Sequence, residues 1–180
     1  MLEGSIVALV TPMKFDGAVD WTALEKLLEW HLEKGTHGIV PMGTTGESAT
    51  LDTDEHLKVI ERTIEVVGGR IPVIAGTGSN STAEAIHQTQ EAERAGADAC
   101  LLVTPYYNKP TQDGLYAHYR EIALATSVPI VLYNVPPRTA CDMSATTVAR
   151  LSELDGIVGI KEACGNAERV KEIRDLVDEG

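Results

Sequence analysis

The 180-residue sequence has few cysteines, little positive charge and no long apolar run, and each shortage excludes a class of protein. Cys100, Cys141 and Cys164 lie far apart and form no C-x-x-C pair, so we expect neither a disulfide framework nor a bound metal ion. The net charge is −12, whereas nucleic acids and anionic membranes require clustered lysine and arginine. We therefore expect no nucleic-acid partner and no membrane partner.

Membrane-spanning and secreted proteins are disfavoured by two further absences. No stretch approaches the roughly 20 apolar residues of a membrane-spanning helix. The N-terminal segment MLEGSIVALV is acidic where a signal peptide is basic, and scarce cysteine suits a reducing compartment. We therefore expect a cytoplasmic protein.

Nucleotide-binding signatures are also missing. The segment GTTGES, residues 43–48, looks like a phosphate-binding loop, but Glu47 stands where such a loop needs a lysine. The segment VTPMKFDG, which follows the first apolar run, lacks the glycines of the dinucleotide-binding fingerprint. A nucleotide-binding module is therefore not expected.

Six short apolar runs recur along the chain, and a helical pattern follows each of them. Helix starts are indicated by Asp20, by the capping-box-like pairs Asp52 with Glu55 and Ser81 with Glu84, and by Asn166. The spacing is that of a βα unit, so we expect a parallel sheet covered by helices. The runs are SIVALV, GIVPM, PVIAG, ADACLLV, PIVLY and GIVGIK, and the last three helices are expected at 113–126, 144–154 and 167–179.

Two α/β architectures fit this order, an open doubly wound sheet and a TIM (β/α)8 barrel. Polar side chains gather just past the C-terminal ends of several runs, which is how a barrel builds its active site. Only about six of the eight βα units of a barrel are present. We therefore expect residues 1–180 to form an incomplete barrel domain without the last strands and the C-terminal helical extension, either as a fragment or as a natural short form.

Lys161 is the first candidate for catalysis, because it ends the apolar run Ile157–Ile160. The period of two in a strand places Ile157, Gly159 and Lys161 on one side, and we expect that side to face inward and to desolvate the amine partly. Desolvation lowers the pKa of a lysine and makes it a nucleophile that forms Schiff bases with ketones. The alternative is an ordinary lysine at a strand end that pairs with Glu162 or Glu47 and reaches water.

Tyr133 ends the preceding strand by the same count, so a phenol and an amine are expected to end adjacent strands. Schiff-base chemistry needs a group that transfers protons, and a phenol within hydrogen-bond reach can do so. The alternative is a core tyrosine with a satisfied hydroxyl.

Six motifs together resemble the dihydrodipicolinate synthase family: GSIVALVTPM, GTTGESATL, RIPVIAGTGSN, TPYYNKPTQDGLYAHY, YNVPPRT and GIKEACGN. The resemblance implies a TIM barrel with added C-terminal helices, assembled as a homotetramer. It also implies a lyase of lysine (diaminopimelate) biosynthesis that condenses pyruvate with L-aspartate 4-semialdehyde to 4-hydroxy-tetrahydrodipicolinate. The only cofactor-like group would be the covalent Schiff base with pyruvate. For the 180 residues alone, low turnover is expected.

The resemblance also assigns roles to single residues. Lys161 matches the lysine that condenses with pyruvate, and Thr45 matches the residue that holds the pyruvate carboxylate. Tyr133, Thr44 and Tyr107 match a hydroxyl relay for protons, in which Tyr107 reaches into a neighbouring subunit. Arg138 matches the residue that receives the carboxylate of the semialdehyde.

The segment GTTGES thereby gains an expected function. Thr44 is in phase with Val40 and Met42, so its hydroxyl is expected to point inward, while Thr45 and nearby backbone N–H groups bind a carboxylate. The alternative is a strand-to-helix turn that ends in a helix cap.

Related pyruvate-dependent aldolases, such as N-acetylneuraminate lyase and the keto-acid aldolases, are an alternative, and a non-catalytic truncated remnant is another. Arg138 favours the synthase because a guanidinium binds a carboxylate through two parallel hydrogen bonds.

An allosteric lysine site at a subunit interface is also implied by the resemblance, although His56 is equally explained as solvated and Glu84 as part of a capping box. The matching positions are Ser48, Ala49, His56, Asn80, Glu84 and Tyr106.

Overall fold

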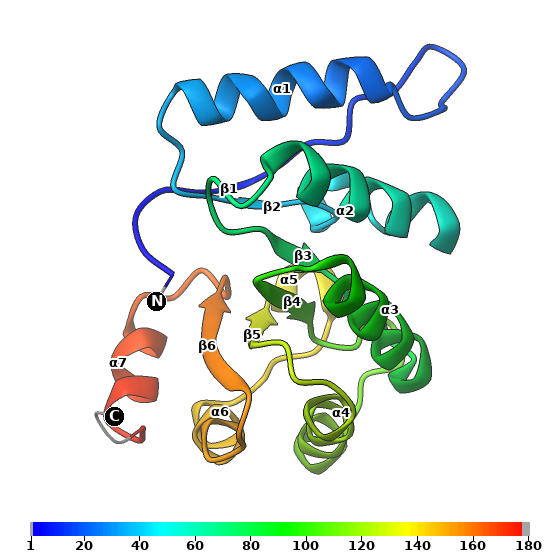
Figure 1. Ribbon diagram of the computed structural model, residues 1–180. Helices are drawn as coiled ribbons and strands as arrows, with labels where there is room; N and C mark the ends of the chain where they lie inside the picture. Colours follow the sequence, from blue (N-terminus) through cyan, green and yellow to red (C-terminus); the bar gives the residue numbers. More distant parts are fainter. Residues whose placement is uncertain (1, 178–180) are drawn as a thin grey trace. The chain divides into compact units, whose positions relative to one another are not determined.

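The computed structural model describes residues 2–177 and divides them into two compact units (Figure 1). The first unit contains the residues up to Thr77 together with Glu91–Cys100. The second contains Gly78–Gln90 and the residues from Leu101 onward. Each unit is a set of parallel strands and covering helices, which confirms the α/β class.

The first unit is built on three short parallel strands. β1 (Ile6–Ala8) pairs with β2 (Gly38–Val40), and β2 meets β3 (Ile74–Gly76) through a bridge between Ile39 and Val73. The helices α1 (Trp21–Glu33) and α2 (Thr53–Val67) pack against each other. β2 and β3 are buried along their whole length, as the sequence predicts, whereas β1 is partly exposed, with Ile6 at its start 37% exposed.

The two helix starts predicted in this unit are confirmed. The side chain of Asp20 accepts a hydrogen bond from the Ala23 N–H group, and that of Asp52 accepts one from the Glu55 N–H group. The buried face of α2 includes two polar residues, His56 and Thr63. The buried residues of α2 are His56, Val59, Ile60, Thr63 and Val67.

Two elements cross the boundary between the units, α3 (Thr82–Ala95) and β4 (Ala99–Val103). Gly96 closes α3 with a φ of +96°, a backbone conformation that glycine adopts without strain at helix ends. The predicted capping box at its start is only half formed. The Ser81 hydroxyl accepts from the Glu84 N–H group, but the Glu84 carboxylate accepts from Ser79 Oγ at 2.6 Å instead of reaching back to Ser81.

The second unit continues with β5 and β6, which follow the last part of β4 in the order β4–β5–β6. β5 and β6 are parallel, with Tyr133 opposite Lys161 and Asn134 opposite Glu162. The helices α4 and α6 lie side by side in Figure 1 and contact each other. The elements are β5 (Ile130–Asn134), β6 (Ile157–Glu162), α4 (Gln112–Ala125), α5 (Pro136–Thr139), α6 (Ala145–Ser152) and α7 (Glu168–Arg174).

The ends of the predicted helices agree well with these bounds, except in α7. Asn166 Oδ1 accepts from the Glu168 N–H group, as expected of a helix start. The helix ends at Arg174, and the last residues of the predicted 167–179 segment lie outside the described part of the chain. Over residues 2–177, no helix has the length and apolar content that crossing a membrane requires.

Candidate active site

Lys161 and Tyr133 lie together at the C-terminal ends of β6 and β5. They are register partners, and Lys161 Nζ lies 4.5 Å from the centroid of the Tyr133 ring, which is within cation–π range. The Tyr133 side chain is buried, with 7% of its surface exposed. The prediction that a phenol and an amine end adjacent strands is therefore confirmed.

The prediction that Lys161 is desolvated is wrong for this structure, in which the residue is exposed. β6 is the last strand in the order β4–β5–β6 and pairs with β5 along one edge. Val158 is 59% exposed, and a Cβ added at Gly159 would meet nothing within 4 Å. The pairing with β5 is also irregular between Ile157 and Gly159, so the predicted alternation does not place these two residues and Lys161 on one buried side.

The alternative in which Glu162 pairs with Lys161 is not what the side chains do. Glu162 faces the opposite side of the sheet and accepts hydrogen bonds from Asn134 Nδ2, at 3.0 and 3.1 Å, and from the Cys164 N–H group. Asn134 is fully buried, and its Nδ2 also donates to Asp142 Oδ1 at 2.8 Å. The sequence analysis missed Asn134, which has no motif of its own.

Arg169 completes this network from α7. Its guanidinium donates to both carboxylate oxygens of Asp142 and to the carbonyl of Met143. The Arg169 hydrogen bond is the largest cause that holds the pKa of Asp142 below its usual range, opposed by partial burial and assisted by the hydrogen bond from Asn134. The same pairing raises the pKa of Arg169. An ionised carboxylate is thus fixed close to the end of β5.

Arg138 and Tyr107 lie on segments that meet at Thr139. Arg138 is exposed on the one-turn helix α5, and the Tyr107 N–H group donates to the Thr139 carbonyl at 3.4 Å. The Thr139 hydroxyl is buried and bonds to Thr104 Oγ1 and to the backbone of Cys141. Tyr107 is 89% exposed and has a φ of +73°. The side chains of Arg138 and Tyr107 are therefore free to contact other molecules.

Thr44 and Thr45 form a short 3-10 turn (η1, Thr44–Gly46) in the first unit, and both are exposed. The prediction that Thr44 continues the alternation of β2 is wrong, because β2 ends at Val40 and Met42 has a left-handed backbone with a φ of +54°. The turn is held by Thr11, whose hydroxyl donates to the Gly46 carbonyl at 2.7 Å.

The six positions matched to an allosteric lysine site divide between the units, with Ser48, Ala49 and His56 in the first and Asn80, Glu84 and Tyr106 in the second. His56 is not solvated: it is 4% exposed, and its Nε2 lies 2.7 Å from the Gly76 carbonyl oxygen. In the second unit Asn80 Nδ2 donates to the Tyr106 carbonyl at 3.1 Å.

The three cysteines are unpaired and differ in environment. Burial raises the pKa of the Cys100 thiol to about 12 and also raises that of Cys141. Cys164 is half-buried in the loop after β6, where its Sγ lies 3.6 Å from the Asn166 carbonyl oxygen. Across residues 2–177, no three His, Cys, Asp or Glu side chains are grouped so that they could hold a metal ion.

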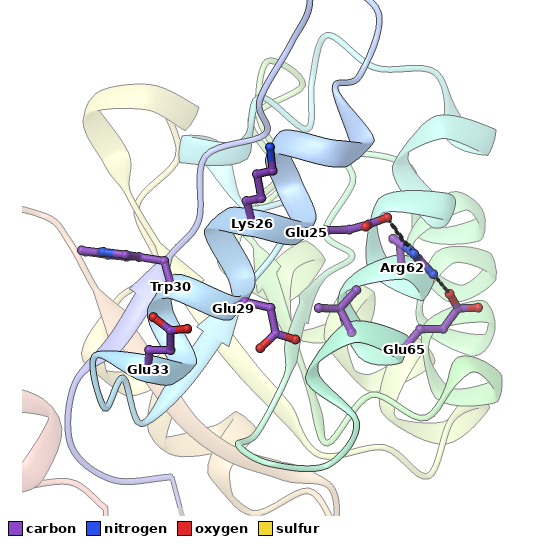
Figure 2. Close-up of a pocket in the computed structure, with 8 residues that line it drawn as sticks. Glu25, Lys26, Glu29, Trp30, Glu33, Arg62 and Glu65 are labelled. Atoms are coloured by element: carbon purple, nitrogen blue, oxygen red, sulfur yellow. Dashed lines mark hydrogen bonds and ion pairs between the residues drawn. The ribbon is translucent and has the colours of Figure 1, made fainter.

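A surface groove in the first unit lies between α1 and α2 and contains none of the predicted site residues (Figure 2). Arg62 stands between Glu25 and Glu65 and forms ion pairs with both. Glu29, Glu33 and Trp30 line the rest of the groove. Arg62 pairs with two of the carboxylates and Glu29 pairs with Arg70, so the groove is a network of surface ion pairs and holds none of the residues assigned to the reaction.

Comparisons with known proteins agree with the resemblance seen in the motifs. A model of the Dihydrodipicolinate synthetase family matches residues 1–180. The 4-hydroxy-tetrahydrodipicolinate synthases of Ectopseudomonas mendocina and Pseudomonas syringae pv. syringae are 61% and 64% identical over 177 and 173 residues. These alignments cover 98% and 96% of this chain, and 61% and 59% of the relatives.

Solved structures give the same result. The chloride-inhibited dihydrodipicolinate synthase of Acinetobacter baumannii, complexed with pyruvate, has a TM-score of 0.97 and 58% identity, covering 99% of this chain and 61% of that one. A lysine-bound synthase from Cyanidioschyzon merolae has a TM-score of 0.94 and 44% identity, and the match covers 98% of this chain and 61% of that one. The predicted TIM-barrel class is confirmed, and the chain spans about three fifths of the length of these relatives.

Proposed function

Because the chain belongs to the dihydrodipicolinate synthetase family, we propose that it carries the Schiff-base centre of a 4-hydroxy-tetrahydrodipicolinate synthase. The substrates would be pyruvate and L-aspartate 4-semialdehyde, and the product would enter lysine biosynthesis. The observation that carries the proposal is the position of Lys161 Nζ, 4.5 Å from the Tyr133 ring centroid at paired strand ends.

The chemistry begins with attack of the neutral Lys161 amine on the ketone carbon of pyruvate, followed by loss of water to give an imine. Loss of a methyl proton then converts the imine to an enamine, whose carbon attacks the aldehyde carbon of the semialdehyde. Water then hydrolyses the imine and frees the lysine, and the amino group of the former semialdehyde condenses with the ketone so formed, closing the ring as a cyclic imine with loss of water. Tyr133 is the group of this unit best placed to donate and accept the protons of these steps.

Arg138 suits the second carboxylate, since its exposed guanidinium can form two parallel hydrogen bonds with it. We also propose that Tyr107, which is 89% exposed, contacts a second copy of the chain in a homo-oligomer. The roles of Thr44 and Thr45, and the allosteric lysine site, stay predictions that rest on the resemblance. The pyruvate complex of the Acinetobacter baumannii relative supports pyruvate as the first substrate.

The test is reductive trapping of the full chain with pyruvate and borohydride, followed by peptide mass mapping. We expect one irreversible adduct, on Lys161, and none in the Lys161→Ala variant. Lys171→Ala is the matched control, because Lys171 is an exposed lysine on α7 and its loss should leave trapping unchanged. An adduct on another lysine, or no adduct in folded protein, contradicts the proposal.

The assignment of the two carboxylate sites is tested separately with Arg138→Ala. Trapping by pyruvate should persist in this variant, while the KM for the semialdehyde rises. Loss of pyruvate trapping would show that Arg138 serves the first substrate and not the second.

A further inference from the structure

We propose that Asn134 is a positioning residue for the Schiff-base lysine, because its side-chain amide fixes the end of β6 from the face opposite Tyr133 and Lys161. The effect of Asn134 on the reaction rests on the proposed function, because it assumes that Lys161 forms the Schiff base. The fixed geometry itself can be measured without any substrate.

The amide of Asn134 has a partner for every group it offers. Its Nδ2 donates to Asp142 Oδ1 at 2.8 Å and to both oxygens of Glu162 at 3.0 and 3.1 Å, while its Oδ1 accepts from the Met143 N–H group at 3.0 Å. The orientation of the amide is unambiguous, because two carboxylates need the donor and a backbone N–H group needs the acceptor. Asn134 is also fully buried, so solvent does not compete for these bonds.

These bonds hold the last residue of β6 and the loop after it. The Asn134 carbonyl accepts from the Ala163 N–H group at 2.8 Å, and Glu162 accepts from the Cys164 N–H group at 2.8 Å. Residues 162–164 are therefore tied to one residue of β5. Lys161 directly precedes this segment, and its own face of the strand is open.

Alternation along the strands connects this network to the reactive pair. Asn134 and Glu162 are register partners on one face, and Tyr133 and Lys161, each one residue earlier, are partners on the other. A shift of Glu162 relative to Asn134 would shift Lys161 relative to Tyr133 by a similar distance. The hydrogen bonds at the end of β6, together with its pairing to β5, therefore restrain where the amine points.

The charges of the network explain why a neutral amide is required. Asp142 and Glu162 both approach Nδ2, so two carboxylates face one group. Arg169 donates to both oxygens of Asp142, whereas the Glu162 oxygens accept from Asn134 Nδ2 and from the Cys164 N–H group. In Asn134→Asp, a third carboxylate of the same size would replace the donor, and repulsion should push the end of β6 away.

The first measurement compares reductive trapping by pyruvate in the full chain and in Asn134→Asp, at a temperature where both are folded by circular dichroism. We expect the trapping rate at saturating pyruvate to fall at least tenfold, with little change in the pyruvate concentration at half-maximal rate. Tyr119→Phe is the control, because it also removes a hydrogen bond of a fully buried side chain in this unit, to the Leu102 carbonyl. Its trapping rate should stay within twofold of the parent.

A swap of the two groups provides the rescue. Asn134→Asp combined with Glu162→Gln restores one amide and one carboxylate across the same register pair, in the opposite order. Because the carboxylate placed at position 134 still faces Asp142, we expect the double variant to recover part of the lost rate, whereas a general loss of stability at Asn134 would allow no recovery. A trapping rate of Asn134→Asp equal to that of the parent overturns the proposal.

The second measurement needs no reaction. Reductive ¹³C-methylation of the lysines gives an NMR signal for Lys161, identified by its absence in Lys161→Arg, that the nearby Tyr133 ring shifts. Asn134→Asp should move this signal toward that of the exposed Lys171, whereas Tyr119→Phe should not move it. An unchanged Lys161 signal in Asn134→Asp overturns the proposal. If the parent chain is never trapped at Lys161, the proposed function fails instead, and the NMR comparison still decides the role of Asn134.

Discussion

β5 and β6 are parallel partners that both begin with an apolar run, and their register is regular from Val131 and Gly159 onward, but β5 is buried and β6 is open. Ile130, Leu132 and Asn134 of β5 are 0 to 1% exposed, whereas Val158 of β6 is 59% exposed. β5 lies between β4 and β6, while β6 has a strand on one side. A hydrophobic run thus predicts a strand, but its burial depends on neighbours that the run itself does not encode.

The difference matters for the candidate site, because Lys161 stands on the open strand and the groups that surround it stand on the buried one. Tyr133 and Asn134 occupy consecutive positions of β5 and contact opposite faces of the end of β6. The buried strand therefore supplies the rigidity, and the open strand supplies the accessible amine.

The strongest test of this comparison uses two isoleucines that face each other in the register, Ile130 and Ile157. Ile130→Ala removes a fully buried side chain, so it should cost about 2–5 kcal/mol of unfolding free energy. Ile157→Ala, at a half-buried position, should cost about 1 kcal/mol. Urea denaturation of the 180-residue chain measures both, and equal losses would show that β6 is packed as well as β5.

Burial should also change the pKa values of ionisable side chains, and His118 of α4 provides a test. The side chain is 5% exposed, and burial lowers the pKa of His118 to about 4. Between the ordinary histidine value of about 6.5 and this pKa, the unfolded chain takes up a proton that the folded chain refuses. The unfolding free energy should therefore fall as the pH falls through this range, by up to about 3 kcal/mol.

His118→Asn should remove most of that pH dependence, because an amide does not titrate in this range. The new amide can still bond to Thr82 Oγ1, which lies 2.9 Å from His118 Nδ1, so the packing should be kept. The exposed His37 is the control, and His37→Asn should leave the slope in place. Urea denaturation at a series of pH values gives the slopes. A slope that persists in His118→Asn would assign the acid sensitivity to other groups.

The ion pair between Arg169 and Asp142, which holds the hydrogen-bond network at the end of β5, can be weakened by acid or by mutation. Since Arg169 holds the pKa of Asp142 below its usual range, the pair stabilises the fold above the unfolded pKa of an aspartate, and this is lost as the pH falls through the folded value. Arg169→Gln should cost about 0.5–1 kcal/mol at neutral pH, because Asp142 is 46% exposed and solvent screens the pair. A double-mutant cycle with Asp142→Asn, at neutral and acid pH, measures the coupling, and a coupling unchanged in acid would contradict this sign.

The smallest effect is expected on the open strand itself. A Cβ added at Gly159 meets nothing within 4 Å, so Gly159→Ala should stabilise the chain by up to about 0.5–1 kcal/mol by reducing the freedom of the unfolded state. Gly78→Ala is the contrasting variant, because its Cβ would lie 2.4 Å from the Val103 nitrogen. The midpoint temperature of thermal unfolding should rise slightly in Gly159→Ala and fall in Gly78→Ala. A lower midpoint in both variants would mean that β6 is more crowded than its exposure indicates.

The local features of this fold could be predicted from the sequence. The six strands follow from apolar runs, the starts of α1 and α2 from Asp20 and Asp52, and the meeting of Tyr133 and Lys161 from counting along two strands. Each of these depends on residues close together in the chain and on one repeated period.

What could not be predicted depends on distant partners or on a break in the period. The left-handed Met42 ends the alternation that was to orient Thr44. His56 looks solvated in a first helical turn because its partner, the Gly76 carbonyl, is 20 residues away. Asn134 gains its position from Asp142 and Glu162, which are 8 and 28 residues away, so nothing next to it in the sequence marks its role.

The unequal burial of the three cysteines makes a spectroscopic handle available without engineering. Cys100 and Cys141 are shielded, and their raised thiol pKa values keep them in the unreactive protonated form, whereas Cys164 is partly accessible. A maleimide fluorophore should therefore label Cys164 selectively in the native chain. Cys164 lies in the loop that Glu162 restrains, three positions after Lys161, so its emission should respond when the lysine forms or loses an imine. Labelled at this thiol, the chain would report the covalent step in real time, with no borohydride to stop it.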